Sequence, residues 1–367
     1  MVPFPWQKIA VACPNADWYN ILAQPGQRPR HQHTRQQALN RHGCGSIMED
    51  NGNTMKDIMQ SASRALKNTM TESLKKMGPE YIFAERVRKL FGDNDKKRDA
   101  GLTEPGDVCK VRNLAYGSDP EQVLDIYYPE GTLSPLPTIV SVHGGGYVYG
   151  NKDLYRFYCM SLAQRGFTVV NFSYRLAPKH RFPEQLHDVN SVMRFTCRHA
   201  EEYFIDPGNL FFVGDSAGAQ MASQYLAAVT NPSYAELLGL EIPEFAPRAC
   251  ALNCGFYIPD RHQDKMLMKC YLQEPSRIKS EEMDVVSHIT SGFPPSFVMT
   301  SNGDFLRERA EPFVQILTAR GVENELHIYS PDDHELGHVF HCNMKEPYAK
   351  ICNDDECAFF ASHAEKR

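Results

Sequence analysis

The stretch LFFVGDSAGAQMASQYLAAVT, residues 210–230, decides the fold that we expect for this chain. An apolar run leads into GDSAG, and a helix-forming run follows at once. The pattern G-x-S-x-G between a strand and a helix makes a turn so sharp that only glycine fits at Gly214 and Gly218. The Ser216 hydroxyl then stands at the apex, and the N–H of Ala217 lies at a helix N-terminus, where the helix dipole favours an anion. We therefore predict that Ser216 is a nucleophile.

Short runs rich in β-branched and aromatic residues recur on both sides of this stretch, and segments of helical length separate most of the later ones. Strands that alternate with helices predict a mostly parallel sheet with helices on both faces. The predicted strands are CKVRNLAY (109–116), VLDIYY (123–128), TIVSVHG (138–144), TVVNFSY (168–174), LFFVGDS (210–216), CALNCGF (250–256), SFVMTS (296–301) and ELHIYS (325–330). The predicted helices cover 155–166, 184–203, 217–229 and 305–321.

The chain before the sheet divides into two parts. Residues 1–54 are rich in Gln, Arg, His and Asn without a sustained period, so we expect a disordered extension, and Met55 is a candidate start. Residues 55–105 form the second part, in which apolar residues at helical spacing from Met55 to about Phe91 predict two helices that close at Gly92, before a polar hinge. Residues 106–367 are expected to form the catalytic domain.

Two further loops follow predicted strands at the edge where an open α/β sheet binds its ligands. In SVHGGGYVYG, residues 141–150, His143 precedes three glycines, which suit a loop whose N–H groups point to one place; a flexible turn is the alternative. Asp304 follows the run that ends near Ser301, which is where the orienting acid of a hydrolase triad belongs. It could equally cap the helix that begins near Leu306, and the two roles do not exclude each other.

The segment 334–338, HELGH, fits H-E-x-x-H, which on a helix places two zinc ligands on one face with a general base between them. Two features argue against a helix here, namely Gly337 inside the pattern and the preceding SPDD. The extended zinc pattern also requires Gly and His at the positions of His341 and Met344. A zinc metallopeptidase is therefore the less favoured alternative.

The competing interpretation makes His338 the general base that activates Ser216, with Asp304 as the orienting acid. The chain order serine, acid, histidine is that of one large class of serine hydrolases. His334 and His341 are then expected to be surface or structural residues. This chemistry requires neither a metal nor an organic cofactor.

Composition excludes several other classes. A formal net charge of −6 argues against nucleic acid as a partner, since that usually requires a basic stripe. No apolar run reaches the roughly 18 residues that span a bilayer. Eleven cysteines, an odd and scattered number, indicate reduced thiols in a cytoplasmic protein.

Several motifs together resemble the hormone-sensitive lipase family of α/β-hydrolases over roughly residues 60–367. They are HGGGYVYG, YRLAPKHRFPEQLHDV, GDSAGAQMA, PPSFVMTSNGDFLRE and HVFH, in the family's order and spacing. The resemblance implies an α/β-hydrolase fold, with a mostly parallel central sheet flanked by helices and a helical cap. The cap would comprise the helices near 55–92 and an insertion near 257–292. Lys179 departs from the family pattern, in which many relatives have Glu.

Carried over position by position, the resemblance implies a role for each motif residue. The catalytic residues would be Ser216, Asp304 and His338. The N–H groups of the oxyanion hole would come from Gly144, Gly145 and Ala217. Structural support of the loops would come from His143, Tyr174 and Arg175, in addition to the turn glycines Gly214 and Gly218.

The expected function is hydrolysis of carboxylic esters with short to medium acyl chains, through an acyl-enzyme intermediate. The expected partners are a small-molecule ester and, as an assembly, a homodimer. An amidase, a formamidase or an exopeptidase on the same fold is the main alternative, because the same triad serves all of them. A ligand-binding module without catalysis is a further one.

Overall fold

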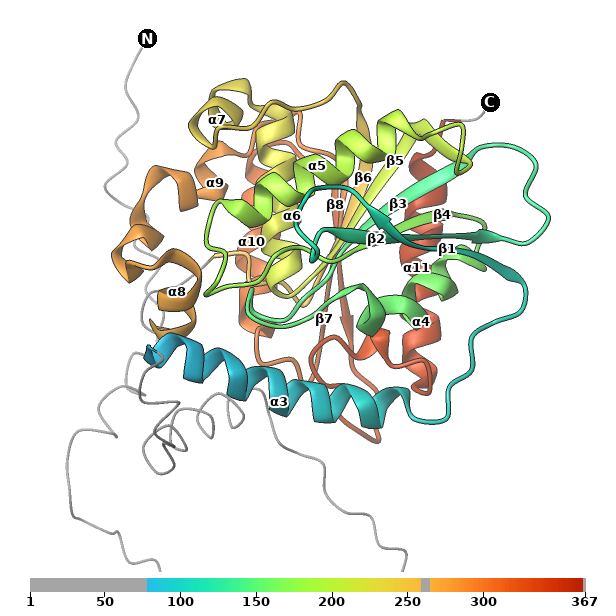
Figure 1. Cartoon of the computed structure of the whole chain (residues 1–367), viewed down its shortest axis with the longest axis horizontal. Coiled ribbons are helices and arrows are strands. Elements are labelled where there is room, and N and C mark those ends of the chain that lie inside the picture. The colour runs from blue at the N-terminus through green and yellow to red at the C-terminus, as the bar shows by residue number, and fades with distance from the viewer. Residues whose placement is uncertain (1–77, 259–264, 366–367) are drawn as a thin grey trace, which may run out of the picture. The chain divides into compact units, whose positions relative to one another are not determined.

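The computed structural model describes residues 78–258 and 265–365, which are built around an eight-stranded sheet (Figure 1). The strand order is β1-β2-β4-β3-β5-β6-β7-β8. The β1–β2 and β2–β4 pairs are antiparallel and all other pairs are parallel, which confirms the prediction of a mostly parallel sheet. Each predicted strand overlaps an observed one. The strands are β1 (Val108–Ala115), β2 (Val123–Pro129), β3 (Leu136–Val142), β4 (Thr168–Phe172), β5 (Ile205–Asp215), β6 (Pro247–Asn253), β7 (Ser296–Ser301) and β8 (Asn324–Tyr329).

Helices cover both faces of the sheet because the apolar residues of the central strands point alternately to either side. Along β5, Phe211 stacks on Phe360 of α11 with the ring centroids 4.9 Å apart, whereas Phe212 faces the other way, 5.9 Å from Tyr225 of α6. The α-helices in the described residues are α3 (Pro79–Asp99), α4 (Lys152–Ala163), α5 (Glu184–Arg198), α6 (Ala217–Thr230), α7 (Pro232–Leu237), α8 (Lys265–Leu272), α9 (Val285–His288), α10 (Ala310–Ala319) and α11 (Pro347–His363). Short 3-10 helices are η2 (Pro275–Lys279), η3 (Glu281–Met283), η4 (Arg307–Arg309) and η5 (Phe340–Cys342).

The strand order places the predicted functional loops together. β3 and β5 are neighbours, and the chain reaches β5 only after forming β4 on the far side of β3. Open α/β sheets bind ligands at such a switch point, where the loops that leave two adjacent strands diverge. The loop after β3 begins at His143, and the turn after β5 contains Ser216.

Helix α3 corrects one prediction. Gly92 was expected to close a helix, but α3 continues through it to Asp99 (Figure 1). A glycine inside a helix costs about 1 kcal/mol relative to alanine, which tertiary packing readily offsets. Here Phe91 packs edge-on against Tyr149, and Arg98 forms an ion pair with Asp95 in the last turn. The predicted helix before Gly78 and the predicted extension 1–54 lie outside the described residues.

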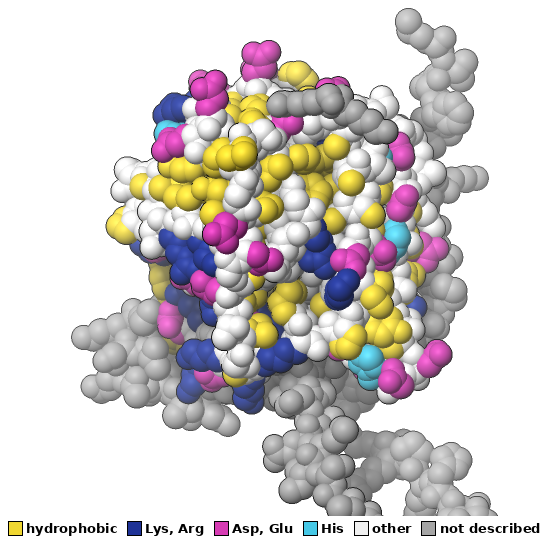
Figure 2. Space-filling model, turned by 90° about the vertical axis from the view of Figure 1, so that its right-hand side faces the viewer, with side chains coloured by type: hydrophobic (Ala, Val, Ile, Leu, Met, Phe, Trp, Pro, Cys, Tyr) yellow, Lys and Arg dark blue, Asp and Glu magenta, His cyan; other side chains and the backbone are white. Residues whose placement is uncertain are grey.

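The N-terminal part of α3 contacts α8, the first helix of the segment 265–288. The Cys270 thiol donates to the carbonyl oxygen of Glu80 at 3.4 Å, and Lys269 pairs with the Glu80 carboxylate at 3.5 Å. None of the helices in the described residues is long and apolar enough to cross a bilayer. The nine cysteines within residues 78–258 and 265–365 are free thiols. The face in Figure 2 carries Lys and Arg as well as Asp and Glu side chains among hydrophobic ones.

Candidate active site

Ser216 forms the turn between β5 and α6 in a strained backbone conformation. Its φ of 55° and ψ of −115° lie in a region that residues with side chains rarely adopt, at a cost on the order of 1–3 kcal/mol. β5 ends at Asp215 and α6 begins at Ala217, so this single residue makes the reversal. The Ser216 N–H donates to the carbonyl oxygen of Asn253 at 2.9 Å, which ties the turn to the end of β6.

Gly214 and Gly218 allow the chain to pass through this turn. A Cβ atom on Gly214 would lie 2.6 Å from the carbonyl oxygen of Gly218. A Cβ atom on Gly218 would overlap the carbonyl oxygen of Val142 at the end of β3. Neither position has room for a side chain, as the sequence predicts.

Asp304 and His338 lie together because their loops are paired. Gly303 and Gly337 form a parallel bridge, the Gly303 N–H donates to Leu336 at 3.0 Å, and the Ser301 hydroxyl donates to the same carbonyl oxygen at 2.8 Å. The Nδ1 atom of His338 consequently lies 2.7 Å from Oδ1 of Asp304.

The Asp304 carboxyl group is held in its ionised form. Burial alone would raise its pKa, but attraction to His338 and three hydrogen bonds outweigh burial and lower the pKa below its ordinary value. The donors are His338, the Leu306 N–H at 2.9 Å and the Thr300 hydroxyl at 2.7 Å. Asp304 thus contacts His338, and its Oδ1 accepts from the Leu306 N–H in the turn before η4. It is not the N-cap of η4 or of α10, whose N-cap residues are Leu306 and Arg309.

The second ring nitrogen of His338, Nε2, is buried and has no hydrogen-bond partner among the described residues. Within the described residues, no hydrogen bond joins His338 Nε2 to the Ser216 hydroxyl. Hydrogen bonds between catalytic groups are often long until a substrate binds. Cys254 lies between the serine turn and the pair formed by Asp304 and His338. It follows Asn253, the acceptor of the Ser216 N–H, and its thiol lies with the Asp304 and His338 donor atoms, all within 4.8 Å of one another. Burial raises the Cys254 pKa well above its ordinary value, so it remains a thiol.

The glycine loop after β3 requires a correction to the expected oxyanion hole. The N–H of Gly144 already donates to the Tyr155 hydroxyl at 2.9 Å, so it is not available to a ligand. Gly145 and Gly146 have φ values of 116° and 59°, and their N–H groups have no acceptor among the described residues. Ala217 is the first residue of α6, so its N–H has no acceptor within the helix. The available donors are therefore those of Gly145, Gly146 and Ala217.

Two side chains support this loop from behind. His143 is buried and stacks on Tyr174, with the ring centroids 3.9 Å apart, and the Tyr174 hydroxyl donates to the His143 carbonyl oxygen at 3.1 Å. Burial lowers the pKa of His143 to about 4, so the ring is neutral. Its Nδ1 lies 2.7 Å from the carbonyl oxygen of Gly144, which assigns the proton to Nδ1 because a carbonyl can only accept.

Arg175 supports the loop after β4. Its Nε and Nη2 groups bond to the buried carboxylate of Asp188, and its Nη1 group bonds to Glu184 at 2.8 Å. Lys179, where the family resemblance would place an acid, is exposed and pairs with Glu121 at 2.8 Å.

The HELGH segment lies in a loop and not on a helix. Exposed His334 pairs with Asp333 and Glu346, whereas His338 pairs with Asp304. The described residues contain two clusters of potential metal ligands, and neither includes His334. The two histidines thus do not form the common helix face that the zinc interpretation requires. His341 is fully buried, as a structural residue would be.

Sequence reasoning missed two aromatic side chains at the site. Tyr155, from α4, holds Gly144, and no motif marks it because a tyrosine in an apolar helix is ordinary core. Phe305 places its ring centroid 4.3 Å from that of His338 and is 37% exposed. Its position directly after Asp304 was the available signal.

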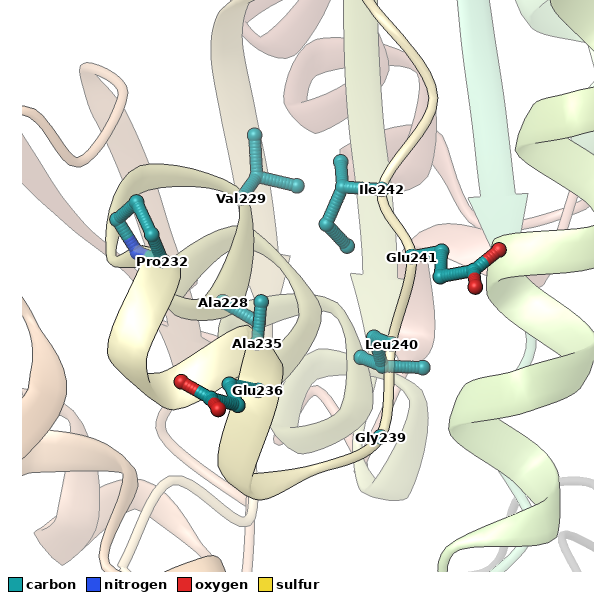
Figure 3. A pocket seen from close by; sticks show the side chains of 9 residues that line it. All are labelled: Ala228, Val229, Pro232, Ala235, Glu236, Gly239, Leu240, Glu241 and Ile242. Atoms are coloured by element: carbon teal, nitrogen blue, oxygen red, sulfur yellow. The ribbon is translucent and has the colours of Figure 1, made fainter.

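A groove of about 560 Å³ lies elsewhere, between the C-terminal end of α6, α7 and the loop that follows (Figure 3). Val229 and Ile242 flank it in Figure 3, and none of its lining residues belongs to the site described above. We assign it no part in catalysis.

This chain is similar in sequence to a family of known proteins. The family model described as "alpha/beta hydrolase fold" matches residues 139–341, more than half of the chain. Carboxylesterase NlhH of Mycobacterium tuberculosis is 27% identical over 238 residues, which are 59% of this chain and 71% of that protein. A probable isoprenylcysteine alpha-carbonyl methylesterase of Arabidopsis thaliana is 32% identical over 112 residues, 30% of this chain and only 24% of that protein.

Solved structures show the same fold. Esterase B from Lactobacillus rhamnosis, inhibited by a tributyrin phosphonate, has a TM-score of 0.71 at 23% identity and covers 80% of this chain and 96% of its own. A bacterial heroin esterase has a TM-score of 0.62 at 21% identity, over 77% of this chain and 92% of its own. The family match confirms the resemblance seen in the motifs: this chain belongs to the α/β hydrolases, in the branch related to hormone-sensitive lipase and the carboxylesterases.

Proposed function

We propose that the protein is a serine hydrolase that cleaves carboxylic esters of short to medium acyl chains through an acyl-enzyme intermediate. The observation that carries this proposal is the state of His338, with Nδ1 bonded to the buried Asp304 carboxylate and Nε2 unpartnered among the described residues. A general base needs that arrangement, because one nitrogen must be fixed as a donor so that the other can accept a proton. The names of both curated relatives cited above, a carboxylesterase and a methylesterase, support ester chemistry.

The reaction would run in two halves. His338 Nε2 takes the hydroxyl proton as Ser216 Oγ attacks the ester carbonyl, and Asp304 stabilises the imidazolium that forms. The alcohol leaves with the proton from His338, and water repeats the attack on the acyl-enzyme to release the acid. The N–H groups of Gly145, Gly146 and Ala217 would stabilise the tetrahedral oxyanion, each by about 3–4 kcal/mol as judged from single-donor deletions elsewhere.

The helices α3 and α8, with the segment that follows to residue 288, are proposed to form the cap over the acyl site. Leu267 of α8 lies against Gly146, since a Cβ atom there would be 3.2 Å from its Cδ1. Tyr271 of α8 stacks on Tyr147 with the ring centroids 3.7 Å apart. Bulky side chains thus approach the glycine loop, which favours acyl chains shorter than those of long-chain lipids. The short-chain phosphonate named for Esterase B points the same way.

The full chain with Ser216→Ala tests the proposal, with Ser161→Ala as the matched control because Ser161 lies on α4 and donates to Tyr158. We expect Ser216→Ala to lose p-nitrophenyl butyrate hydrolysis by on the order of 10⁴-fold or more and to escape labelling by a fluorophosphonate probe. A panel from acetate to palmitate, with one p-nitroanilide, should show a preference for acetate through octanoate. Retained activity in Ser216→Ala would refute the nucleophile.

The alternatives give different results in the same assays. Preference for the anilide would indicate an amidase or exopeptidase. Loss of activity on treatment with a chelator, restored by zinc, would revive the metallopeptidase. An inactive wild-type protein that the probe does not label would indicate a binding module.

A further inference from the structure

A cluster of buried polar side chains lies next to Ser216, and these side chains take no part in the proposed reaction. Asp215, His341 and Cys342 are each at most 2% exposed, as are Asn253 and Glu356. Ionisable groups in a protein interior are expensive unless they are paired and fully hydrogen-bonded. Because this cluster adjoins Ser216, we looked for its role in the arrangement of the active site.

Asp215 joins the serine turn to the histidine loop. It directly precedes Ser216, and its Oδ1 lies 3.1 Å from His341 Nε2, while its Oδ2 accepts from the Cys342 thiol at 3.4 Å. Because a carboxylate can only accept, Nε2 of His341 carries the proton. Burial alone would lower the pKa of His341, but the attraction of Asp215 outweighs burial and raises it.

A second layer of bonds holds this contact in place. The Asn253 amide, at the end of β6, donates to Glu356 of α11 at 2.8 Å, and the Tyr158 hydroxyl of α4 donates to the other oxygen of Glu356 at 2.7 Å. The Asn353 amide donates to the His341 carbonyl oxygen at 3.2 Å. The layer includes Asn253, the residue whose own carbonyl oxygen receives the Ser216 N–H.

The spacing along the chain gives this contact a consequence for His338. His341 lies three residues after His338, and the chain between them passes through the left-handed Val339, at φ 52°. The serine turn and the His338 loop, which the proposed reaction brings together, are thus also joined by the hydrogen bond between Asp215 and His341. A displacement of about 1 Å in a catalytic group costs on the order of 100-fold in rate.

A metal ion is the competing occupant, since the donor atoms of Asp215, His341 and Cys342 lie within 4.8 Å of one another. Structural zinc sites use four ligands, however, and this cluster supplies three. Both Asp215 oxygens already receive donors from the protein. Hydrogen bonding accounts for the cluster without an ion.

We propose that Asp215 and His341 form a positioning pair that sets the distance between Ser216 and His338, with Cys342 as its second donor. The proposal rests on the proposed function of Ser216 and His338. Neither member of the pair touches the substrate; each acts through the backbone of a catalytic neighbour.

The test compares His341→Leu, which removes the donor, with His341→Gln, which keeps an N–H donor. His334→Gln, in the same loop but exposed, is the control. For the full chain we expect His341→Leu to lower kcat on p-nitrophenyl butyrate by about 10- to 100-fold per active site titrated with fluorophosphonate, with KM within about twofold. His341→Gln should recover to within about fivefold of wild type, and His334→Gln should match wild type.

Other outcomes separate the possible failures. If His341→Leu has a lower unfolding midpoint but an unchanged kcat per titrated site, His341 has a purely structural role, and the proposed positioning role is refuted. Stoichiometric zinc in the wild-type protein, lost in His341→Leu, would also overturn it. If the wild-type protein is not labelled at Ser216, the proposed function fails first.

If His341→Leu does not fold, Cys342→Ala and Cys342→Ser replace it. Removing the thiol donor should lower kcat by about threefold or more with KM unchanged, and serine should restore it. Equal kcat values in Cys342→Ala and wild type would overturn the proposal.

Discussion

The N–H of Gly144 donates a hydrogen bond of 2.9 Å to the hydroxyl of Tyr155, and this contact engages the first amide of the glycine loop within the protein. Gly144 is buried, so its N–H must find a partner within the protein. With that group engaged, the following amides of Gly145 and Gly146 are the ones left without an acceptor in the described part of the chain.

Replacing Tyr155 with Phe should therefore disturb catalysis from outside the triad. The change leaves the Gly144 N–H buried and unpaired, which costs about 1–3 kcal/mol in the free energy of unfolding. We expect kcat on p-nitrophenyl butyrate to fall about tenfold, because the loop amides lose their fixed direction. Tyr329→Phe, which loses a hydroxyl bonded to Asp355 away from the loop, should keep wild-type kcat. A higher kcat in Tyr155→Phe would instead mean that Gly144 itself serves the oxyanion.

The hydrogen bond between Gly144 and Tyr155 could not be predicted from the sequence. The glycine loop could be located from its three consecutive glycines, but the choice among their amides depends on a hydroxyl from α4, and no local pattern encodes that choice. Helix α3 is a similar case, since packing at Phe91 and Tyr149 decides that it continues past Gly92.

The strands and the chemistry-bearing loops were predictable because their signals are local. β-branched and aromatic runs mark all eight strands, and the position of Asp304 after β7 follows from the edge rule for parallel sheets. The sequence also singled out His338 among three neighbouring histidines. It did not reveal that His341 bonds to Asp215, because that pairing joins residues 126 positions apart.

Replacing Asp304 with Asn tests the orientation of His338. The amide keeps the size of the side chain but removes the charge, and kcat should fall roughly 10⁴-fold, as expected when the imidazole takes the wrong tautomer. The folded-state pKa of Asp304 is below its unfolded value, so its stabilisation is present at neutral pH and disappears as pH falls through the folded-state pKa. The difference in free energy of unfolding between wild type and Asp304→Asn should accordingly shrink at pH below about 4, as measured by urea denaturation. Asp332→Asn, an exposed acid, serves as the control. A difference that does not change with pH would contradict the charge assignment.

Phe305 should affect the preference of the protein among esters that differ in their alcohol group. Its ring lies against His338, the group that we propose hands the proton to the leaving alcohol, and is partly exposed. Phe305→Ala should lower kcat/KM for 1-naphthyl butyrate about fivefold more than for ethyl butyrate, since an aromatic contact contributes about 0.5–1.5 kcal/mol. Ile328→Ala, another exposed apolar side chain, should leave that ratio unchanged. Equal losses on both esters would mean that Phe305 only shields the imidazole.

Glu356 should make the stability of the fold depend on pH. Burial raises its pKa to about 7, above the ordinary 4.5, so the folded chain holds a proton that the unfolded chain releases between these values. The free energy of unfolding must then fall as pH rises from about 4.5 to about 7, by roughly 3 kcal/mol from this group alone. Glu356→Gln, which is neutral throughout and can still bond to Asn253 and Tyr158, should lack this decline.

Urea denaturation at pH 5, 6, 7 and 8 measures the effect as the difference between Glu356→Gln and wild type, which cancels the contributions of groups that do not interact with Glu356. The variant should gain in relative stability as pH rises through the window and reach a plateau above it. Glu236→Gln, an exposed carboxyl group on α7, should show no such trend. A constant difference across the four pH values would mean that Glu356 is ionised throughout, in which case its bonds to Asn253 and Tyr158 outweigh burial.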